Sequence, residues 1–246
     1  MIRGARAALA AVCFAVLPAA AAEPREDAAR IAILAERAGK LHAQAIAGVS
    51  ADRARRALAA ATRDMDTMLR EASGRAPLAL RDHYALFGLL WREYRAFLSR
   101  PAGRDTARMQ LDRDEELGYL AMKGRTAAGL LPPTREALVR ASVAAQRAAR
   151  LALLRREAST AGEADAVSQL RSTLAELEPA LGRDEGLAAE VHVALNQLPF
   201  LEQALADPAP RSARALDLVA RSADNILEAL ERADRHAAGL SASGPR

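Results

Sequence analysis

Long cationic and amide side chains recur at helical spacing in two stretches of this chain. Arg37, Lys40 and Gln44 stand at positions i, i+3 and i+7, so they share one face of a helix. Arg147 and Arg150 repeat the first of these spacings 110 residues later. Guanidinium donors match the geometry of oxyanions, so two such faces that meet inside a bundle or across a dimer are predicted to hold a small planar anion. The alternative is ordinary surface polarity, in which the arginine stems cover apolar surface.

The sequence contains no signature of a catalytic or metal site. The four histidines have no histidine partner at i+4, and neither a G-x-S-x-G elbow nor a phosphate or dinucleotide loop occurs. The acidic run at residues 112–116 lacks the glycine and the later glutamate of a calcium loop, and is interpreted as a helix face favoured by the macrodipole. We therefore expect a protein that is not an enzyme and that has no metal and no cofactor.

The N-terminus has the pattern of an export signal. Arg3 and Arg6 precede an apolar run over residues 7–17, and residues 18–22 end in an A-x-A site that predicts cleavage after Ala22. An uncleaved anchor is the alternative, but the run is shorter than the ~20 residues that span a bilayer. The sequence thus predicts a signal peptide over 1–22 and a periplasmic protein. Its fold must depend on its core alone, because the only cysteine, Cys13, leaves with the signal.

Charge and composition argue against nucleic-acid binding. The net charge is +4, and the loss of Arg3 and Arg6 with the signal lowers it to +2. Acidic and basic residues are interspersed, and aromatic residues make up only 3% of the chain, which is too few for base-stacking platforms. We expect no nucleic-acid partner.

The composition predicts helices throughout. Alanine, leucine, arginine and glutamate dominate, and proline and glycine mostly fall between segments. We expect helices at about 26–47, 50–74, 77–99, 105–128 and 134–160, with Gly162 separating the fifth from the sixth. Heptad patterns over 167–181, 187–205 and 216–237 are typical of antiparallel bundles. Residues 241–246 are expected to form a disordered tail.

The order of the segments predicts an internal duplication. Residues 37–41 parallel 147–151, residues 90–98 parallel 198–205, and residues 117–128 parallel 227–238. The clearest boundary between the copies is the Gly-Leu-Leu-Pro-Pro stretch at 129–133. The expected fold is therefore all-α, with two tandem antiparallel helical-bundle repeats of about four helices each, over 23–129 and 134–240.

This layout resembles the PilJ-type domain, the N-terminal sensory domain of type IV pili chemotaxis transducers, which is related to the sensory bundles of NarX-type nitrate sensors. The family opens with a motif close to I-N-x-A-G-R-Q-R-M-L-S-Q-R. Ile33 matches its isoleucine, Lys40-Leu41 take the Arg-Met place, and Gln44 matches the glutamine. In the second copy Arg150-Leu151 take that place and Arg155 is the last arginine. The family's later aromatic or aliphatic helix resembles residues 91–98 and 198–205, and the resemblance covers about residues 26–240.

The resemblance and the charged faces together lead to a function hypothesis. It is a periplasmic sensory or ligand-binding helical protein that binds a small anion such as nitrate or nitrite and acts with a membrane receptor or sensor protein. A homodimer would be ordinary for this architecture. The alternative is a structural or adaptor bundle that binds another helical protein through an exposed heptad seam, without a small ligand. A sensor requires Arg37, Lys40, Arg147 and Arg150 to face inward or into a cleft, whereas an adaptor requires only an exposed apolar stripe.

Overall fold

The computed structural model describes residues 24–100, 105–154, 160–206 and 212–243. Within these ranges every regular element is a helix, which confirms the all-α prediction. The predicted signal peptide lies outside the described residues. The helices are α1 (Pro24–Ile46), α2 (Ala51–Arg75), α3 (Leu78–Leu98), α4 (Thr106–Ala128), α5 (Pro133–Leu154), α6 (Thr160–Ala175), α7 (Glu178–Leu181), α8 (Glu185–Ala206) and α9 (Ala213–Ser243).

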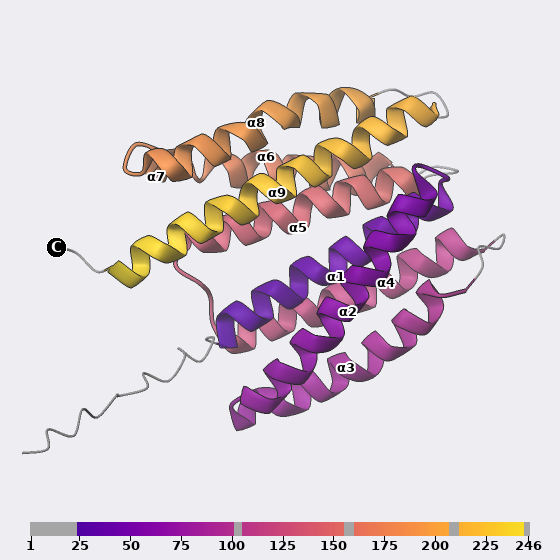
Figure 1. Ribbon diagram of the computed structural model, residues 1–246, viewed down its shortest axis with the longest axis horizontal. Helices are drawn as coiled ribbons and strands as arrows, with labels where there is room; N and C mark the ends of the chain where they lie inside the picture. The colour runs from indigo at the N-terminus through magenta and orange to yellow at the C-terminus, as the bar shows by residue number, and fades with distance from the viewer. Residues whose placement is uncertain (1–23, 101–104, 155–159, 207–211, 244–246) are drawn as a thin grey trace, which may run out of the picture.

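Two helices, α1 and α5, lie side by side in the middle of the bundle and run in the same direction (Figure 1). Helix α1 also packs against α2 and α4, and α3 packs against α2 and α4 on the outside. Helix α5 packs in turn against α6 and α9, and α8 packs against α9. We call α1–α4 the first half and α5–α9 the second half. The two halves meet mainly where α1 contacts α5, so side chains of these two helices end up inside the protein.

Most predicted helix boundaries are correct to within a few residues, but two are wrong. Helix α5 is described as far as Leu154, and the predicted end of that helix falls beyond this described range. Gly162 lies within α6 instead of separating two helices. Helix α9 continues to Ser243, so the first three residues of the predicted tail are helical, while 244–246 lie outside the described residues. The short helix α7 was not predicted. Glycine lowers helix stability by only ~1 kcal/mol, which the packing of a helix can outweigh.

Helix caps differ between the two halves. Ser50 and Asp105 occupy the N-cap positions of α2 and α4, but neither side chain accepts a capping hydrogen bond. Ser50 instead adopts a left-handed conformation with φ 47°. In the second half, Asp184 caps α8 by accepting the N–H groups of Gly186 and Leu187 at 2.9 and 3.1 Å. Such a bond satisfies a backbone donor that the helix itself leaves free.

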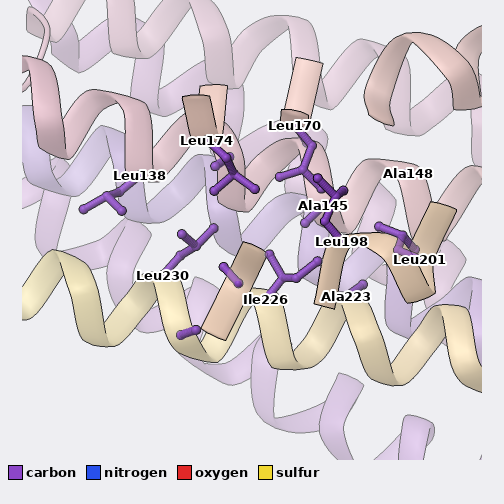
Figure 2. Close-up of a cluster of buried hydrophobic side chains, with 14 of the residues drawn as sticks. Leu138, Ala145, Ala148, Leu170, Leu174, Leu198, Leu201, Ala223, Ile226 and Leu230 are labelled. Carbon is purple, nitrogen blue, oxygen red and sulfur yellow. The ribbon is translucent and has the colours of Figure 1, made fainter. Parts of the chain in front are cut away.

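The cores of the two halves are built from different residues. In the second half the heptad leucines meet alanines of α5 and α9 (Figure 2), and residues such as Leu170, Leu174 and Leu201 are completely buried. In the first half the largest buried side chains are aromatic, with Phe87, Trp91, Tyr94 and Phe97 all on α3. Burying one such side chain stabilises a fold by ~1.5–3 kcal/mol. The heptad positions of the second half are therefore core positions, as their spacing predicts.

Small residues line the contact surface of α5. Its alanines at 141, 144, 145, 148 and 149 are all completely buried, and they lie on more than one face of the helix. Alanine side chains allow neighbouring helix axes to approach closely, because the distance between axes depends on the side chains at the contact. Helix α5 is thus enclosed by α1, α6 and α9, and a long polar side chain on it must find partners within the protein.

Candidate functional site

The five predicted ligand residues occupy three different environments. Lys40, Gln44 and Arg150 are buried, Arg37 is half-buried, and Arg147 is exposed. Those on α1 lie beside α2 and α9, whereas Arg150 lies between α1 and α4. Three of the five side chains thus reach the interior, and the two predicted faces project to different sides of the α1–α5 contact.

Lys40 is held by a carboxylate from the other half of the molecule. Its Nζ donates to Oδ2 of Asp224 on α9 at 2.7 Å. The Lys40 side chain is 0% exposed, while that of Asp224 is 39% exposed. Burial lowers the pKa of Lys40, and the attraction of Asp224 opposes this change. The pair therefore consists of a cation that is shielded from water and a carboxylate that is partly exposed to it.

Arg150 is held by two carboxylates of the first half. Its Nη1 donates to Glu36 on α1, and its Nε lies 3.2 Å from Oδ2 of Asp114 on α4. The other Asp114 oxygen accepts a short hydrogen bond from the Tyr94 hydroxyl. All four side chains are buried. This group, which we call the Arg150 cluster, joins α5 of the second half to α1, α3 and α4.

Burial determines the direction of most pKa shifts in the Arg150 cluster. It raises the pKa of Glu36 and of Asp114, and the nearby Arg150 charge only partly opposes the rise. Burial disfavours the charge of Arg150 too, but Glu36 and Asp114 together raise its pKa above the ordinary value. Burial also raises the pKa of Tyr94 well above its usual range. Arg150 and Tyr94 thus stay protonated, and the two carboxyls are the groups that can change charge.

The cluster continues through two buried polar side chains of the first half. Gln110 donates to the Gly39 carbonyl at 2.6 Å, and its Oε1 lies 2.9 Å from Nδ1 of His42. A methyl group at Gly39 would lie 2.8 Å from Asp114 Oδ1 and 3.0 Å from the Tyr94 hydroxyl. Glycine is therefore favoured at position 39, because a Cβ there would force side chains of the cluster to shift.

The two buried cations are linked crosswise. Lys40 and Arg150 are 110 residues apart, and so are their partners Asp114 and Asp224. The cation of the first half contacts the carboxylate of the second half, and the cation of the second half contacts the carboxylate of the first. Each half thus supplies one cation from its first helix and one acid from its last helix. The pairs connect the halves and satisfy groups that would be costly to bury alone.

Sequence reasoning missed the acidic side of this arrangement. Asp114 belongs to the acidic run that was interpreted as a helix face, and for Asp114 that interpretation is wrong because the side chain is buried. Glu36, Tyr94 and Asp224 were not singled out either. The available signal was the 110-residue interval, which links Asp114 to Asp224 as it links Lys40 to Arg150.

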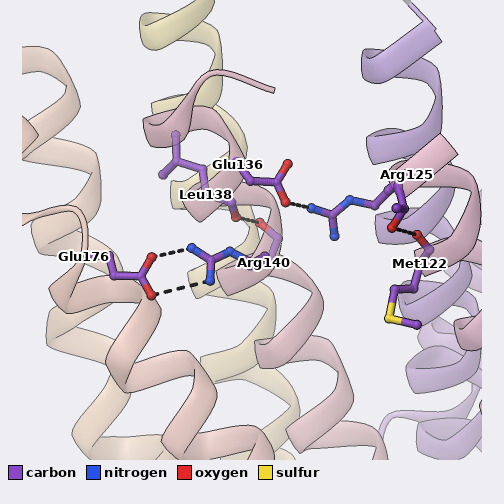
Figure 3. A network of polar contacts seen from close by, with 8 residues as sticks. Met122, Arg125, Glu136, Leu138, Arg140 and Glu176 are labelled. Carbon is purple, nitrogen blue, oxygen red and sulfur yellow. Dashed lines mark hydrogen bonds and ion pairs between the residues drawn. The ribbon is translucent and has the colours of Figure 1, made fainter. Parts of the chain in front are cut away.

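Other ion pairs lie around the start of α5, and two of their arginines connect the halves. Arg125 near the end of α4 donates to Glu136 at the start of α5, whereas in the same region Arg140 bonds Glu176 within the second half (Figure 3). Arg135 on α5 contacts both Glu26 of α1 at 2.6 Å and Asp234 of α9 at 2.7 Å. These bonds lie near the linker at 129–132, so they tie together the end of the bundle where the chain passes from one half to the other.

Two cavities lie along the groove that we call the α1–α2–α9 groove. One, of about 530 Å³, is also lined by α5 and has an apolar floor that includes Ile33, Leu34 and Leu138. The other, of about 490 Å³, is lined by Gln44. Arg37 lines both cavities and has no hydrogen-bond or ion-pair partner among the described residues. Both volumes are within the ~300–1,000 Å³ of typical small-molecule sites.

Metal and membrane features can be assessed only for the described ranges. There, no three histidine, aspartate or glutamate side chains gather as they would around a metal ion. No helix in the same ranges is both long enough and apolar enough to cross a membrane.

Comparisons with known proteins add no family assignment. No family model matches the chain, and neither the curated proteins nor the solved structures include a significantly similar one. The resemblance to the PilJ type therefore stays a prediction, as does the division into two repeats.

Proposed function

We propose that this chain is an exported, non-enzymatic helical protein that binds a small anion in the α1–α2–α9 groove and acts with a membrane partner. The observation that carries the proposal is the position of Arg37, a half-buried cation that lines both cavities of the groove and has no partner in the part of the chain that the structure describes. Lys40 and Arg150 differ from it, because carboxylates already neutralise them. Among the cations predicted to bind the anion, Arg37 is thus the one that is both in a cleft and available.

Gln44 supports the same groove. Its side chain is buried, and its carbonyl oxygen has no hydrogen-bond partner. An unsatisfied buried polar atom costs ~1–3 kcal/mol, so a water molecule that donates to this oxygen would be favoured there. Arg53 on α2 also lines this cavity and has no hydrogen-bond or ion-pair partner among the described residues. Arg37 and Arg53 would supply donors to the anion, and Gln44 would accept a hydrogen bond from a water molecule beside it.

The groove also offers a mechanism for signalling. Helix α2 belongs to the first half and α9 to the second, and both flank α1 in the groove. A ligand that contacts both helices would favour one spacing of the halves over another. Binding would then shift the population of bundle geometries, by no more than the difference in its affinity for them. A membrane partner that contacts both halves would respond to that shift.

The test is the melting temperature of the protein against a panel of small anions that includes nitrate and nitrite. A ligand at ~100 times its Kd adds ~2.7 kcal/mol of stability, which corresponds to several degrees for a chain of this size. We expect Arg37→Gln to abolish the shift. Arg147→Gln is the matched control, because Arg147 stands 110 residues after Arg37 but is exposed. A shift of equal size in both variants would contradict the site, and a flat panel would contradict the proposal for these anions.

The adaptor is the second candidate function, and one observation favours it. Leu111, Tyr119 and Met122 form an exposed apolar stripe on α4, with Tyr119 and Met122 54% and 53% exposed. Exposed apolar groups on one helix face are typical of surfaces that bind another helix. A partner that binds the wild type and Arg37→Gln equally, but not Tyr119→Glu, would favour the adaptor.

A further inference from the structure

A third groove lies within the first half, on the other side of α2 from the proposed anion groove. It has a volume of about 650 Å³ and is lined by the C-terminal parts of α1 and α3 and by residues 55–66 of α2. We call it the basic groove. Four arginines line it: Arg55 and Arg63 from α2, and Arg95 and Arg100 from α3 or the residues just after it.

The basic groove differs from the others in its charge. Its four arginines face one carboxylate, Asp66, which leaves +3, and burial lowers the pKa of the His42 that also lines it. The 530 Å³ cavity has four arginines and four carboxylates, and the 490 Å³ cavity has three of each, so both balance to zero. The basic groove is therefore the one with an uncompensated charge among these three large cavities.

Some arginines of the basic groove have no acidic partner within it. Asp66 accepts from Arg95 and, at 2.8 Å, from the Trp91 indole. Arg55 contacts only the highly exposed Asp52 outside the groove. The guanidinium groups of Arg63 and Arg100 have no hydrogen-bond or ion-pair partner among the described residues. The carbonyl ends of α1 and α3 contribute roughly −0.5 charge each and the start of α2 roughly +0.5, so the groove stays strongly positive.

The floor of the groove is apolar. Leu58 and Leu98 are buried there, and Ala45, Ile46 and Ala59 line it beside them. Two hydroxyl groups, of Thr62 and Ser99, donate to backbone carbonyls of their own helices, which leaves their oxygens as acceptors. An inorganic anion would bind the arginines but would leave the apolar floor exposed to water. A ligand with an apolar body and an anionic head would use both.

We infer that the basic groove binds small amphiphilic organic anions, with the apolar body on Leu58 and Leu98 and the anionic head at Arg63 and Arg100. The ligand class is an aliphatic or aromatic body that carries a carboxylate, sulfonate or phosphate group. This inference goes beyond the proposed function, since the basic groove shares no lining residue with the α1–α2–α9 groove. Either site can exist without the other.

The experiment measures binding of decanoate to the protein, purified after expression of the full chain, by isothermal titration calorimetry at low ionic strength. Acetate carries the same head without the body, and decyltrimethylammonium carries the same body with the opposite charge. We expect decanoate to bind at least tenfold more tightly than either, because each buried methylene adds to affinity and the groove repels cations. Equal affinity for acetate or for decyltrimethylammonium would overturn the inference, as would undetectable binding of decanoate.

Variants locate the site. Arg63→Gln with Arg100→Gln should raise the Kd for decanoate about tenfold or more, since two charge-assisted contacts are lost. Arg56→Gln with Arg92→Gln is the matched control: it removes the same charge from exposed positions of α2 and α3 that do not line the groove. Its Kd should change less than twofold. An unchanged Kd in the first variant, or an equal loss in the control, would overturn the inference.

Two further variants separate this groove from the other. Ala59→Trp would fill the basic groove from an exposed position, and should weaken decanoate binding at least tenfold without changing the melting temperature. Arg37→Gln should leave the decanoate Kd unchanged. Loss of decanoate binding in Arg37→Gln would place the ligand in the α1–α2–α9 groove and overturn the inference, whereas a flat anion panel would affect only the proposed function.

Discussion

Lys40 and Arg150 occupy equivalent positions in the two halves, but they differ in the number of their acidic partners and in the exposure of those partners. Both residues are buried cations on the first helix of their half, and both contact an acid on the last helix of the other half. Lys40 has one partner, Asp224, which remains partly exposed. Arg150 has two, and all the side chains of its cluster are buried. The Arg150 cluster is closed to solvent, while the Lys40 pair is open on its acidic side.

The residues around each cation explain the difference. Glu36 and Tyr94 belong to the Arg150 cluster, and Gly39 lets the cluster approach α1 closely. The residues 110 positions after these three are Gln146, Ala149 and Ala204. The second half thus lacks the second carboxylate, the close backbone approach and the phenol donor. A buried charge needs enough partners to replace its lost hydration, and only the Arg150 cluster supplies several. We therefore expect the free energy of unfolding to depend more on Arg150 than on Lys40.

The largest effect is expected for Arg150→Gln. The change leaves Glu36 and Asp114 buried without their cation, and breaking a buried ion pair from one side costs ~3–5 kcal/mol of unfolding free energy. Urea unfolding followed by circular dichroism measures this loss. Arg147→Gln, one turn away but exposed, is the control and should change stability by less than ~0.5 kcal/mol. Similar losses in the two variants would contradict a specific contribution of the Arg150 cluster to the free energy of unfolding.

A smaller loss is expected for Gly39→Ala. Alanine favours a helix by ~1 kcal/mol relative to glycine, so a free helix would become more stable. Here the new methyl group would meet Asp114 and Tyr94 at 3.0 Å or less, and overpacking in a core costs ~1–3 kcal/mol. We expect a net loss of ~1 kcal/mol, measured by the same unfolding experiment. Gly118→Ala on α4, where the nearest atom is 3.7 Å away, should instead be neutral or stabilising. If Gly39→Ala instead stabilises the protein, the side chains of the cluster can shift away from the new methyl group at little cost in free energy.

Lys40→Met is expected to change stability by no more than ~1 kcal/mol. Asp224 is exposed enough to regain water after the ion pair is lost, and methionine avoids the desolvation of the ammonium group. The comparison with Arg150→Gln in parallel unfolding curves is the direct test of the difference between the two sites. A loss for Lys40→Met as large as that for Arg150→Gln would mean that the open pair is as important as the closed cluster.

The smallest effect is expected from pH, because Arg150 partly opposes the rise that burial causes in the pKa of Glu36 and Asp114. The folded protein holds protons on these carboxyls above their ordinary pKa values of 4.5 and 3.8, so their contribution to stability is greatest below those values. It is lost as pH rises through the folded pKa. The unfolding free energy of the wild type minus that of Glu36→Gln should therefore decrease from pH 4 to pH 8. An increase over that range would contradict the direction of the shift.

Local patterns were sufficient to predict much of the fold. The heptad leucines from Leu170 to Leu201 are buried as their spacing predicts, except for the half-buried Leu181, and the break at 129–132 separates α4 from α5. Gly162 was predicted to separate two helices but lies within α6, because one glycine lowers helix stability by only ~1 kcal/mol in sequence that otherwise favours helix. The absence of side-chain cap bonds at Ser50 and Asp105 depends on backbone geometry that composition does not specify.

The sequence by itself determined the helical fold, the core faces of the last three long helices and the presence of charged residues on the faces of α1 and α5. Those properties follow from propensity and periodicity, which act over a few turns of one helix. Only the tertiary structure decided which cations are available. Asp114 and Asp224 neutralise Arg150 and Lys40 from distant parts of the chain, while Arg37 lies in a groove with no partner from the described ranges. Charge pairing across a bundle depends on which helices pack together, and no local pattern contains that information.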